Sequence, residues 1–330
     1  MKTALSRIDR VLAALRGGEV DRVPVSAWWH DFAREWSPEG LAEATLEAYR
    51  KFGWDFIKVN PRATYYAEDW GARFRASPDR QPELLEAAVR SAEDLARIQP
   101  LAPAQGAYSE QLAALAIIAR DLAGEAPFIQ TVFSPLAVMS RLTGSTRFVQ
   151  RLIAEQPDAL LAALDAVAQT LAAYARACLD VGAAGVFFAT VEWGSGDNIS
   201  PQDYDRFARP FDLRVLEAVR DAPFNVLHVC RDNNHLLRLL DYPVAAFHWD
   251  VTGAGNPTLA EVAARTDRAL MGGVSHQSTM ASGSPEDVAA EGRRAVAETG
   301  GRRFLLAPGC SIDPGTPEAN LRALVEAARL

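Results

Sequence analysis

The stretch Phe224-Asn225-Val226-Leu227-His228-Val229-Cys230 decides the fold, because it is almost continuously apolar and ends in side chains that bind metals. A continuous apolar run is typical of a strand that is covered on both faces of a parallel sheet. Similar short runs recur along the 330 residues. Together they predict eight strands, at Val23–Trp29, Asp55–Asn60, Pro127–Phe133, Gly185–Glu192, Phe224–Cys230, Ala245–Val251, Ala269–Ser275 and Phe304–Cys310.

Segments rich in Ala, Leu, Arg and Glu separate these strands and have helical spacing. An alternation of buried strands and helices is the pattern of a parallel sheet wrapped by helices. We therefore predict an α/β fold, a (β/α)₈ TIM barrel that forms a single domain over residues 1–330. The predicted helices are Gly40–Lys51, Ser109–Leu122, Thr146–Val181, Pro201–Arg220, Leu259–Arg265 and Pro285–Glu298.

Local signals agree with this order of elements. Ser200-Pro201 and Ser284-Pro285 each place a capping hydroxyl before a proline at the first position of a helix. The amphipathic segment Arg7–Leu15 ends at Gly17-Gly18. It predicts a helix within residues 1–20, an N-terminal extension that packs on the barrel or closes its bottom.

A doubly wound sheet is the alternative fold. That fold usually carries a glycine-rich phosphate loop after its first strand. Here the place is taken by Ala27-Trp28-Trp29-His30, which favours the barrel.

Charge and composition exclude several classes of function. A net charge of −8 and a pI near 5.3 leave no basic surface for a nucleic-acid backbone. No apolar run reaches the roughly 18 residues that cross a bilayer, and the N-terminus resembles no signal peptide. The three cysteines are widely separated, which favours reduced thiols. We expect a soluble, cytoplasmic protein without nucleic-acid or membrane partners.

Polar side chains gather at the predicted C-terminal ends of the strands, where a (β/α)₈ barrel builds its active site. His228 and Cys230 are two residues apart on one strand, so they point to the same side of the sheet. Cys310 ends the eighth predicted strand, at the same mouth. One imidazole and two thiolates suit Zn²⁺ and leave a fourth position open for a reactant. An alternative is that the cysteines are buried small apolar residues.

Other strand-end residues are candidates for the same site. Glu192 and Asp250 could be a fourth zinc ligand or could orient His228, or be solvated or ion-paired carboxylates. His276, like His248, fits a hydrogen-bonding residue of the pocket better than a metal ligand. Asn60 and the aromatic residues Trp29 and Trp193 are expected to contact a methyl donor, although such tryptophans often pack under loops. Cys178 lies in an apolar helix and is expected in the core.

Short motifs are spread along nearly the whole chain, at Arg10–Gly17, Asp21–Val25, Ser134-Pro135, Leu142-Thr143-Gly144, Ile199-Ser200-Pro201, His228-Val229-Cys230, Ala307–Ile312 and Thr316–Leu321. Together they resemble the uroporphyrinogen decarboxylase superfamily. The resemblance implies a (β/α)₈ barrel, in agreement with the predicted strands.

Within this superfamily, the His-x-Cys pair and the distant cysteine are similar to the zinc ligands of the methylcobamide:coenzyme M methyltransferases. They are more remotely similar to those of cobalamin-independent methionine synthase. The decarboxylases are less similar, because their Arg-Gln-Ala-Gly-Arg segment is replaced here by Trp28–Arg34. A tetrapyrrole with many carboxylates would also require several cations at the mouth.

The resemblance implies a zinc-dependent methyltransferase that activates a small thiol, or a similar nucleophile, for methyl transfer. The implied donor is a methylated corrinoid (cobalamin). The chain has no Asp-x-His-x-x-Gly corrinoid-ligand segment, so a separate corrinoid protein or free cofactor would have to bring it. A decarboxylase and a non-catalytic barrel that binds a corrinoid or methylated ligand are the alternatives. A homodimer is one of the oligomeric states left open.

Overall fold

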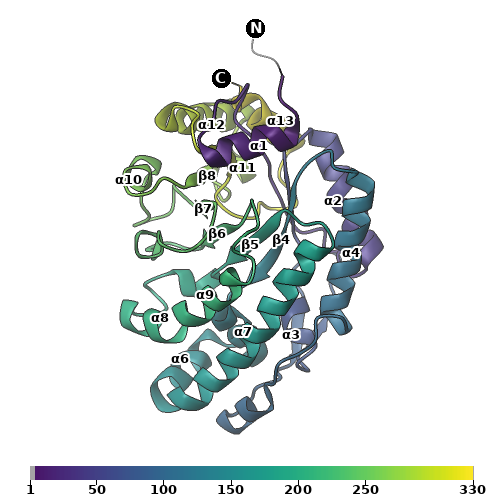
Figure 1. The fold of residues 1–330 in the computed structure, drawn as a ribbon, viewed down its shortest axis with the longest axis vertical. Helices are drawn as coiled ribbons and strands as arrows, with labels where there is room; N and C mark the ends of the chain where they lie inside the picture. The colour runs from purple at the N-terminus through teal and green to yellow at the C-terminus, as the bar shows by residue number, and fades with distance from the viewer. Residues whose placement is uncertain (1–3, 330) are drawn as a thin grey trace.

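The computed structural model describes residues 4–329 and is built on a curled sheet of parallel strands (Figure 1). The order of the strands is β1-β4-β5-β6-β7-β8-β9, and each neighbouring pair is parallel. Helical segments join successive strands, as in a (β/α)₈ barrel. The strands are β1 (Ile57–Val59), β4 (Phe128–Phe133), β5 (Gly185–Ala189), β6 (Val226–Val229), β7 (Ala246–Trp249), β8 (Ala269–Val274) and β9 (Phe304–Pro308).

The first predicted strand, Val23–Trp29, is wrong as a strand. It makes one parallel bridge, between Val25 and Leu306. Leu306 N–H donates to Pro24 O at 2.8 Å, and on the other side Asp55 N–H donates to Val25 O at 2.9 Å. Pro24 has no N–H, which shortens the ladder. The segment still lies between β9 and the start of β1, so it occupies the eighth position of the barrel.

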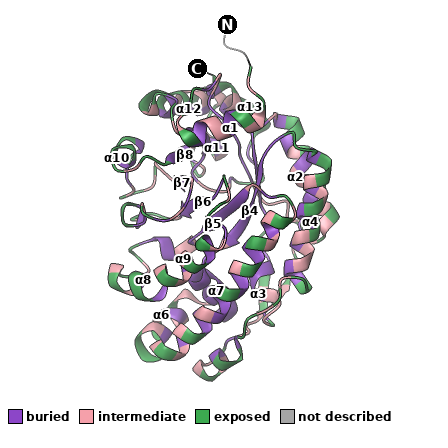
Figure 2. Ribbon diagram, viewed as in Figure 1, coloured by how far each residue is buried: buried purple, intermediate pink, exposed green. Residues whose placement is uncertain are grey.

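Helices cover the outer face of the sheet, with buried faces toward the strands and exposed faces outward (Figure 2). The helices of the described residues are α1 (Arg7–Arg16), α2 (Pro38–Phe52), α3 (Tyr65–Glu68), α4 (Gly106–Leu122), α5 (Pro135–Thr143), α6 (Thr146–Glu155), α7 (Pro157–Asp180), α8 (Pro201–Phe207), α9 (Arg209–Glu217), α10 (Leu259–Ala263), α11 (Thr279–Ser282), α12 (Pro285–Thr299) and α13 (Glu318–Ala327), with 3₁₀ turns η1 (Ala92–Arg97), η2 (Val191–Gly194) and η3 (Leu236–Arg238).

Two of the predicted helices are each two helices in the structure. Thr146–Val181 divides into α6 and α7 at Gln156, and Pro201–Arg220 divides into α8 and α9 at Ala208. A proline follows within two residues of each division, and proline disfavours a continuous helix. The predicted starts at Ser200 and Ser284 are confirmed, since each hydroxyl caps the helix that follows.

A two-stranded antiparallel hairpin was not predicted from the sequence. It consists of β2 (Arg73–Arg75) and β3 (Glu83–Glu86), outside the barrel sheet. Both strands are short, charged and largely exposed, so they lack the apolar runs that marked the other strands.

Helix α1 closes the bottom of the barrel, as the sequence predicts. Val11 and Leu15 pack among residues near the N-terminal ends of the strands, such as Phe224. The guanidinium of Arg10 donates to Asp55 Oδ1 at 2.7 Å, and both side chains are buried. This ion pair fixes α1 to the segment that enters β1.

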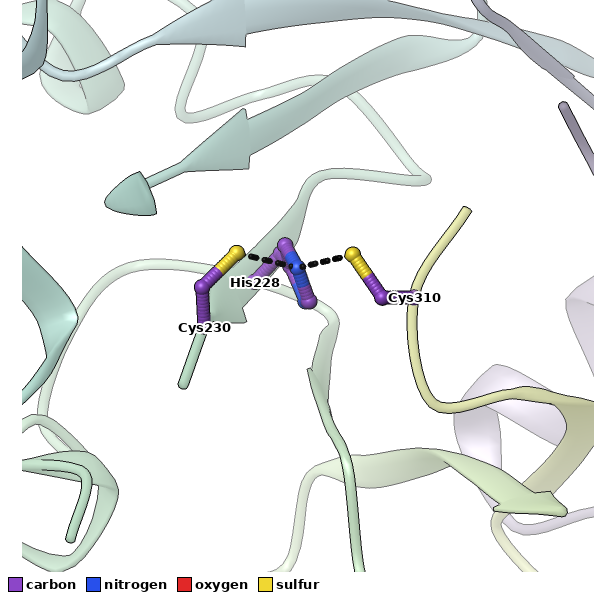
Figure 3. Close-up of side chains that lie close together, drawn as sticks. All are labelled: His228, Cys230 and Cys310. Atoms are coloured by element: carbon purple, nitrogen blue, oxygen red, sulfur yellow. Dashed lines mark hydrogen bonds between the residues drawn. The ribbon is translucent and has the colours of Figure 1, made fainter. Parts of the chain in front are cut away.

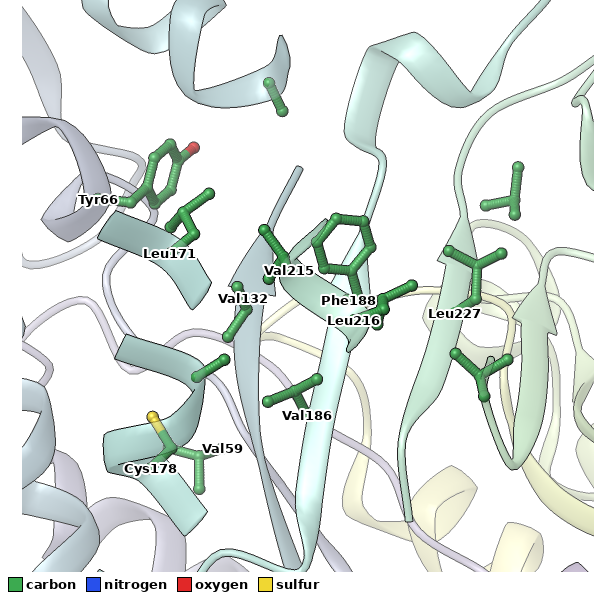
Figure 4. Close-up of a cluster of buried hydrophobic side chains, with 14 of the residues drawn as sticks. Val59, Tyr66, Val132, Leu171, Cys178, Val186, Phe188, Val215, Leu216 and Leu227 are labelled. Carbon is green, nitrogen blue, oxygen red and sulfur yellow. The ribbon is translucent and has the colours of Figure 1, made fainter. Parts of the chain in front are cut away.

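The strands divide the interior into two apolar regions. We call the region enclosed by the sheet the inner core, and the layer between the sheet and the helices the outer core. In β5, for example, Phe187 belongs to the inner core and Phe188 to the outer core. The outer core includes Val59, Tyr66, Val132, Leu171, Cys178, Val186, Phe188, Val215, Leu216 and Leu227 (Figure 4). The inner core consists of Val11, Leu15, Trp28, Phe56, Ile129, Phe187, Ala189, Phe224, Val226, Ala246, Ala269, Met271, Leu305 and Ala307.

None of the helices within residues 4–329 has the length and apolar character needed to cross a membrane.

Candidate metal centre

The structure brings His228, Cys230 and Cys310 together at the C-terminal end of the barrel (Figure 3). His228 is in β6, Cys230 follows that strand directly, and Cys310 follows β9. His228 Nε2 lies 2.6 Å from Cys230 Sγ and 3.5 Å from Cys310 Sγ. All three donor atoms are within 4.8 Å of one another. Histidine is buried and both cysteines are partly exposed, so the group faces the mouth of the barrel.

Backbone geometry at the strand ends places the two sulfurs. Arg231, directly after Cys230, has a φ of 72°, and Val191, before Glu192, has a φ of 52°. Such values are uncommon for residues other than glycine and often occur at functional sites. Before Cys310, a Cβ on Gly309 would come within 2.7 Å of Asp250 Cα. Only glycine therefore allows the ends of β7 and β9 to approach this closely.

A neighbouring histidine sets the tautomer of His228. His248 Nε2 lies 2.9 Å from Pro308 O, and a carbonyl oxygen only accepts, so this nitrogen carries the hydrogen. Burial lowers the pKa of His248 well below its usual value, so the ring is neutral and its Nδ1 accepts. That atom lies 2.7 Å from His228 Nδ1, which must donate. In neutral His228 the lone pair is then on Nε2, facing both sulfurs.

The two cysteine thiols interact and titrate as a pair. The interaction with Cys230 is the main cause that holds the pKa of Cys310 well below its usual range, and His228 and His276 act in the same direction. The same interaction, together with burial, raises the pKa of Cys230. One thiol thus ionises readily, while the second keeps its proton until a cation compensates the charge.

This donor set fits a zinc ion. A neutral imidazole nitrogen and two thiolates are ligands that Zn²⁺ prefers, and three protein ligands are typical of catalytic zinc sites. The Cys230 thiol is within hydrogen-bond distance of His228 Nε2, at 2.6 Å, and a metal ion bound there would take the place of the thiol proton. The residues present therefore match the metal in number and in chemistry.

Asp250 and His276 form a separate pair at the mouth. Asp250 Oδ2 lies 3.3 Å from His276 Nδ1. Burial alone would raise the pKa of Asp250, but His276 and Thr252 outweigh it and lower the pKa. Thr252 donates to the other carboxylate oxygen, at 2.9 Å from its amide and 2.6 Å from its hydroxyl. The ring of His228 contacts His248, while the carboxylate of Asp250 contacts His276 and Thr252.

Glu192 lies in η2 and lines a polar pocket of about 280 Å³. Thr146 donates to its carboxylate at 3.3 Å. Arg141 and Arg231 line the same pocket, and Arg141 donates to the Tyr66 hydroxyl at 3.3 Å. Since Arg231 follows Cys230, this pocket is adjacent to the three donor residues.

The structure separates the three residues expected to contact a methyl donor. Trp29 and Asn60 line one cavity of about 200 Å³, between α2, β1 and the loop after β9. Ser311, next to Cys310, donates to Asn60 Oδ1 at 3.4 Å, so this cavity adjoins the metal centre. Trp193 is fully buried, and its indole N–H donates to Ser140 Oγ at 2.9 Å. In this structure Trp193 is a core residue rather than part of a cavity wall.

Sequence reasoning missed Lys58, which lies on β1 inside the barrel with 6% of its surface exposed. A signal was present, because lysine stands at the centre of the apolar run Asp55–Asn60. Cys178 behaves as expected, since it is fully buried in the outer core and burial raises the pKa of its thiol.

Relatives of known sequence fall into two groups by name. The chain is 25% identical over 340 residues to methylcobamide:CoM methyltransferase MtbA of Methanosarcina acetivorans, covering 97% of each chain. It is 28% identical over 336 residues to methylcobamide:CoM methyltransferase MtaA of Methanosarcina barkeri, covering 96% of each. A uroporphyrinogen decarboxylase of Carboxydothermus hydrogenoformans is 27% identical over 300 residues, covering 88% of this chain and 82% of the relative.

Solved structures show the same architecture. A methyltransferase from Methanosarcina mazei superposes with a TM-score of 0.80 at 25% identity and covers 98% of both chains. A B12-independent methionine synthase from Listeria monocytogenes, with a TM-score of 0.57 at 12% identity, shares the fold over 88% of this chain and 86% of its own.

The family model for uroporphyrinogen decarboxylase (URO-D) matches residues 6–330. The resemblance inferred from the motifs is thus confirmed, and the chain belongs to the uroporphyrinogen decarboxylase family.

Proposed function

We propose that this protein is a zinc-dependent methyltransferase that transfers a methyl group from a methylated corrinoid to a small thiol. The observation that carries the proposal is the convergence of His228 Nε2 with the sulfurs of Cys230 and Cys310 at the barrel mouth. The methylcobamide:CoM methyltransferases among its relatives, which it matches over almost their full length, support the same activity.

In this proposal His228, Cys230 and Cys310 hold the metal. A bound zinc ion would supply a Lewis acid that lowers the pKa of an acceptor thiol at the open position. The neutral tautomer of His228, fixed by His248, keeps a lone pair directed to the site. The acceptor sulfur then forms a bond to the methyl carbon, while the donor leaves with the electron pair of the broken bond.

The two pockets beside the centre indicate how the reactants are held. The cavity lined by Trp29 and Asn60 has about 200 Å³, which suits a small acceptor and is far too small for a corrinoid ring. The corrinoid would present its methyl group at the mouth, from a partner protein or as free cofactor. Arg141 and Arg231 in the polar pocket suit an anionic group on either reactant.

Glu192, Asp250 and His276 are the proposed polar residues around the reacting atoms. Glu192 lies between the polar pocket and Cys230, where its charge helps to raise the pKa of that thiol. The Asp250–His276 pair lies beside Cys310 and can hold a proton near the acceptor. A cytoplasmic location and a homodimeric state stay predictions.

Metal analysis and a methyl-transfer assay test the proposal. We expect about one zinc per chain and methylation of one or more thiols in a panel, with methylcobalamin as donor. Activity should disappear on treatment with a chelator and return with added zinc. A zinc-free protein that transfers methyl groups at the full rate would exclude the proposed mechanism.

The same preparation separates the alternatives. Release of carbon dioxide from a carboxylate-rich tetrapyrrole, unaffected by the chelator, would favour a decarboxylase. Corrinoid binding without any product in a single-turnover reaction would favour a binding protein.

A further inference from the structure

Lys58 is a buried cation inside the barrel with no carboxylate partner among the described residues. Its ammonium donates to Asn60 Oδ1 and otherwise faces aromatic rings. The nitrogen lies 5.5 Å from the centre of the Trp28 ring and 4.9 Å from that of Phe187. No ion pair joins it to any carboxylate within residues 4–329. An isolated charge in such a place is costly and calls for a compensating anion.

The metal centre is the nearest source of negative charge. Phe187, which contacts the ammonium, packs against the imidazole of His228 with 5.0 Å between the ring centres. Burial lowers the pKa of Lys58 to about 7, and the charges of Cys310 and Cys230 act against this shift. Geometry links Lys58 to the same site, because Asn60 Oδ1 accepts from Lys58 and also from Ser311, the residue after Cys310.

A lysine at position 58 is unusual, because this chain contains few lysines. Of its 34 lysines and arginines only three are lysines, at positions 2, 51 and 58. Arginine has a wide, flat head with five donors, whereas lysine ends in one compact charge. Lys58 also lines the cavity of about 200 Å³ that contains Trp29 and Asn60, and its compact ammonium leaves more of this cavity open than a guanidinium would.

We propose that Lys58 is a positioning residue whose positive charge lets the metal centre hold the acceptor as a thiolate in preference to the neutral methylated product. This inference rests on the proposed function. It assigns to Lys58 a role in the electrostatics of the site, without contact to the reacting atoms.

Charge balance explains the preference. A divalent metal with two thiolates and a neutral imidazole has no net charge, so a third thiolate makes the centre negative. The ammonium of Lys58 restores neutrality in that state. When the sulfur receives the methyl group it becomes a neutral thioether. The positive charge of Lys58 then has no negative charge to balance it. The acceptor is held and the product is released.

The test uses the Lys58→Met and Lys58→Gln variants of the full chain. The two new side chains differ in polarity, but both lack the positive charge of lysine. If the charge is what matters, both variants must show the same change in thiol binding. Arg176→Met is the matched control, since Arg176 is an exposed cation on α7 that pairs with Asp180. Thermal unfolding shows whether the variants fold, and replacing a desolvated ammonium by methionine should not lower stability.

Cobalt(II) in place of zinc gives a readout independent of activity. Cys230 and Cys310 already give a sulfur-to-cobalt absorption band, so the increase of this band on addition of 2-mercaptoethanol, which has no charged group besides its thiol, reports coordination of the added sulfur. In both Lys58 variants we expect the pH midpoint of this increase to rise by about one unit or more. At pH 7 the affinity for the thiol should fall about tenfold, while binding of 2-(methylthio)ethanol should not weaken.

The outcomes separate this inference from the proposed function. Variants with the midpoint and affinity of the parent protein would overturn the role of Lys58, yet thiol coordination in the parent would still support the methyltransferase. If the parent protein binds no cobalt, or binds it without coordinating the thiol, both the role of Lys58 and the proposed methyltransferase function are excluded. Weaker binding of mercaptoacetate alone, with 2-mercaptoethanol unchanged, would show that Lys58 binds an acidic group of the acceptor and would also overturn the proposal.

Discussion

The mouth of the inner core and the outer core are both buried, but they differ in what they bury. The outer core is a continuous layer of aliphatic and aromatic side chains on which the helices pack. At the mouth of the inner core lie His228, His248 and Lys58, all under 10% exposed. Burial of apolar surface stabilises a fold, while buried polar groups rarely add net stability. The outer core therefore supplies the stability of the fold, and the barrel mouth can keep reactive polar groups out of water.

The largest effect should come from the ligands. Cys230→Ser and Cys310→Ser should each reduce zinc content from about one per chain to nearly none, because a neutral hydroxyl is a poor ligand for this metal. Metal analysis after dialysis measures the loss. Cys178→Ala is the matched control, since that cysteine is fully buried in the outer core. Retention of zinc in either ligand variant would argue against the site.

In the outer core, Leu171→Ala should lower stability by about 2–5 kcal/mol, since Leu171 is fully buried in α7 and the truncation leaves a cavity. Urea unfolding measures this loss. The zinc affinity of the folded protein should stay unchanged, because this side chain lies outside the barrel. A parallel fall in zinc affinity would show that the two regions are not independent.

His248 lies next to the metal ligands but binds no metal in our proposal, so its replacement should have a smaller effect on zinc than replacement of a ligand. His248→Leu removes the ring nitrogen that accepts from His228 Nδ1–H at 2.7 Å and leaves only the backbone carbonyl of residue 248, at 3.3 Å, so it should weaken zinc binding by about 10-fold or more. Competition with a chromophoric chelator measures the dissociation constant. His248→Gln keeps an amide oxygen that can accept the same hydrogen, so it should recover part of the affinity. Equal affinities for the Leu variant and the parent would exclude the tautomer argument.

Asp212 is a buried carboxylate among the helices, and it predicts that the stability of the protein depends on pH. Burial raises its pKa to about 7, although the hydroxyls of Tyr204 and Tyr242 donate to it at 2.9 and 3.0 Å and oppose the shift. The native state therefore binds this proton more tightly than the unfolded chain. Its contribution to stability is complete below the unfolded pKa, near 4, and is lost as the pH rises to about 7.

Asp212→Asn should remove this dependence. Between pH 5 and pH 8 the stability of the variant relative to the parent should increase by roughly 2–3 kcal/mol, by urea unfolding at both values. Zinc content should not change. A parent protein whose stability rises between pH 5 and 8 by the same amount as the variant would contradict the assignment.

Much of the fold and of the candidate site could be predicted from the sequence, because the C-terminal ends of the strands in a barrel meet at one mouth. That rule brought His228 and Cys230 into one group with Cys310, 82 residues from His228 along the chain. It failed where a local detail decided the outcome: Pro24 reduces the first strand to one bridge. The role of His248 required knowing that Pro308 O lies within reach of its ring, a contact between β7 and β9. Propensity and spacing contain no such information.

The last strand, β9, supplies both Pro308, which fixes the imidazoles, and the turn that carries Cys310. It also pairs with the segment around Val25 near the beginning of the chain. During synthesis on the ribosome the barrel could not close until β9 had been made. Metal uptake would then follow completion of the chain, and a nascent protein lacking its last quarter would expose two donors that cannot yet retain the ion.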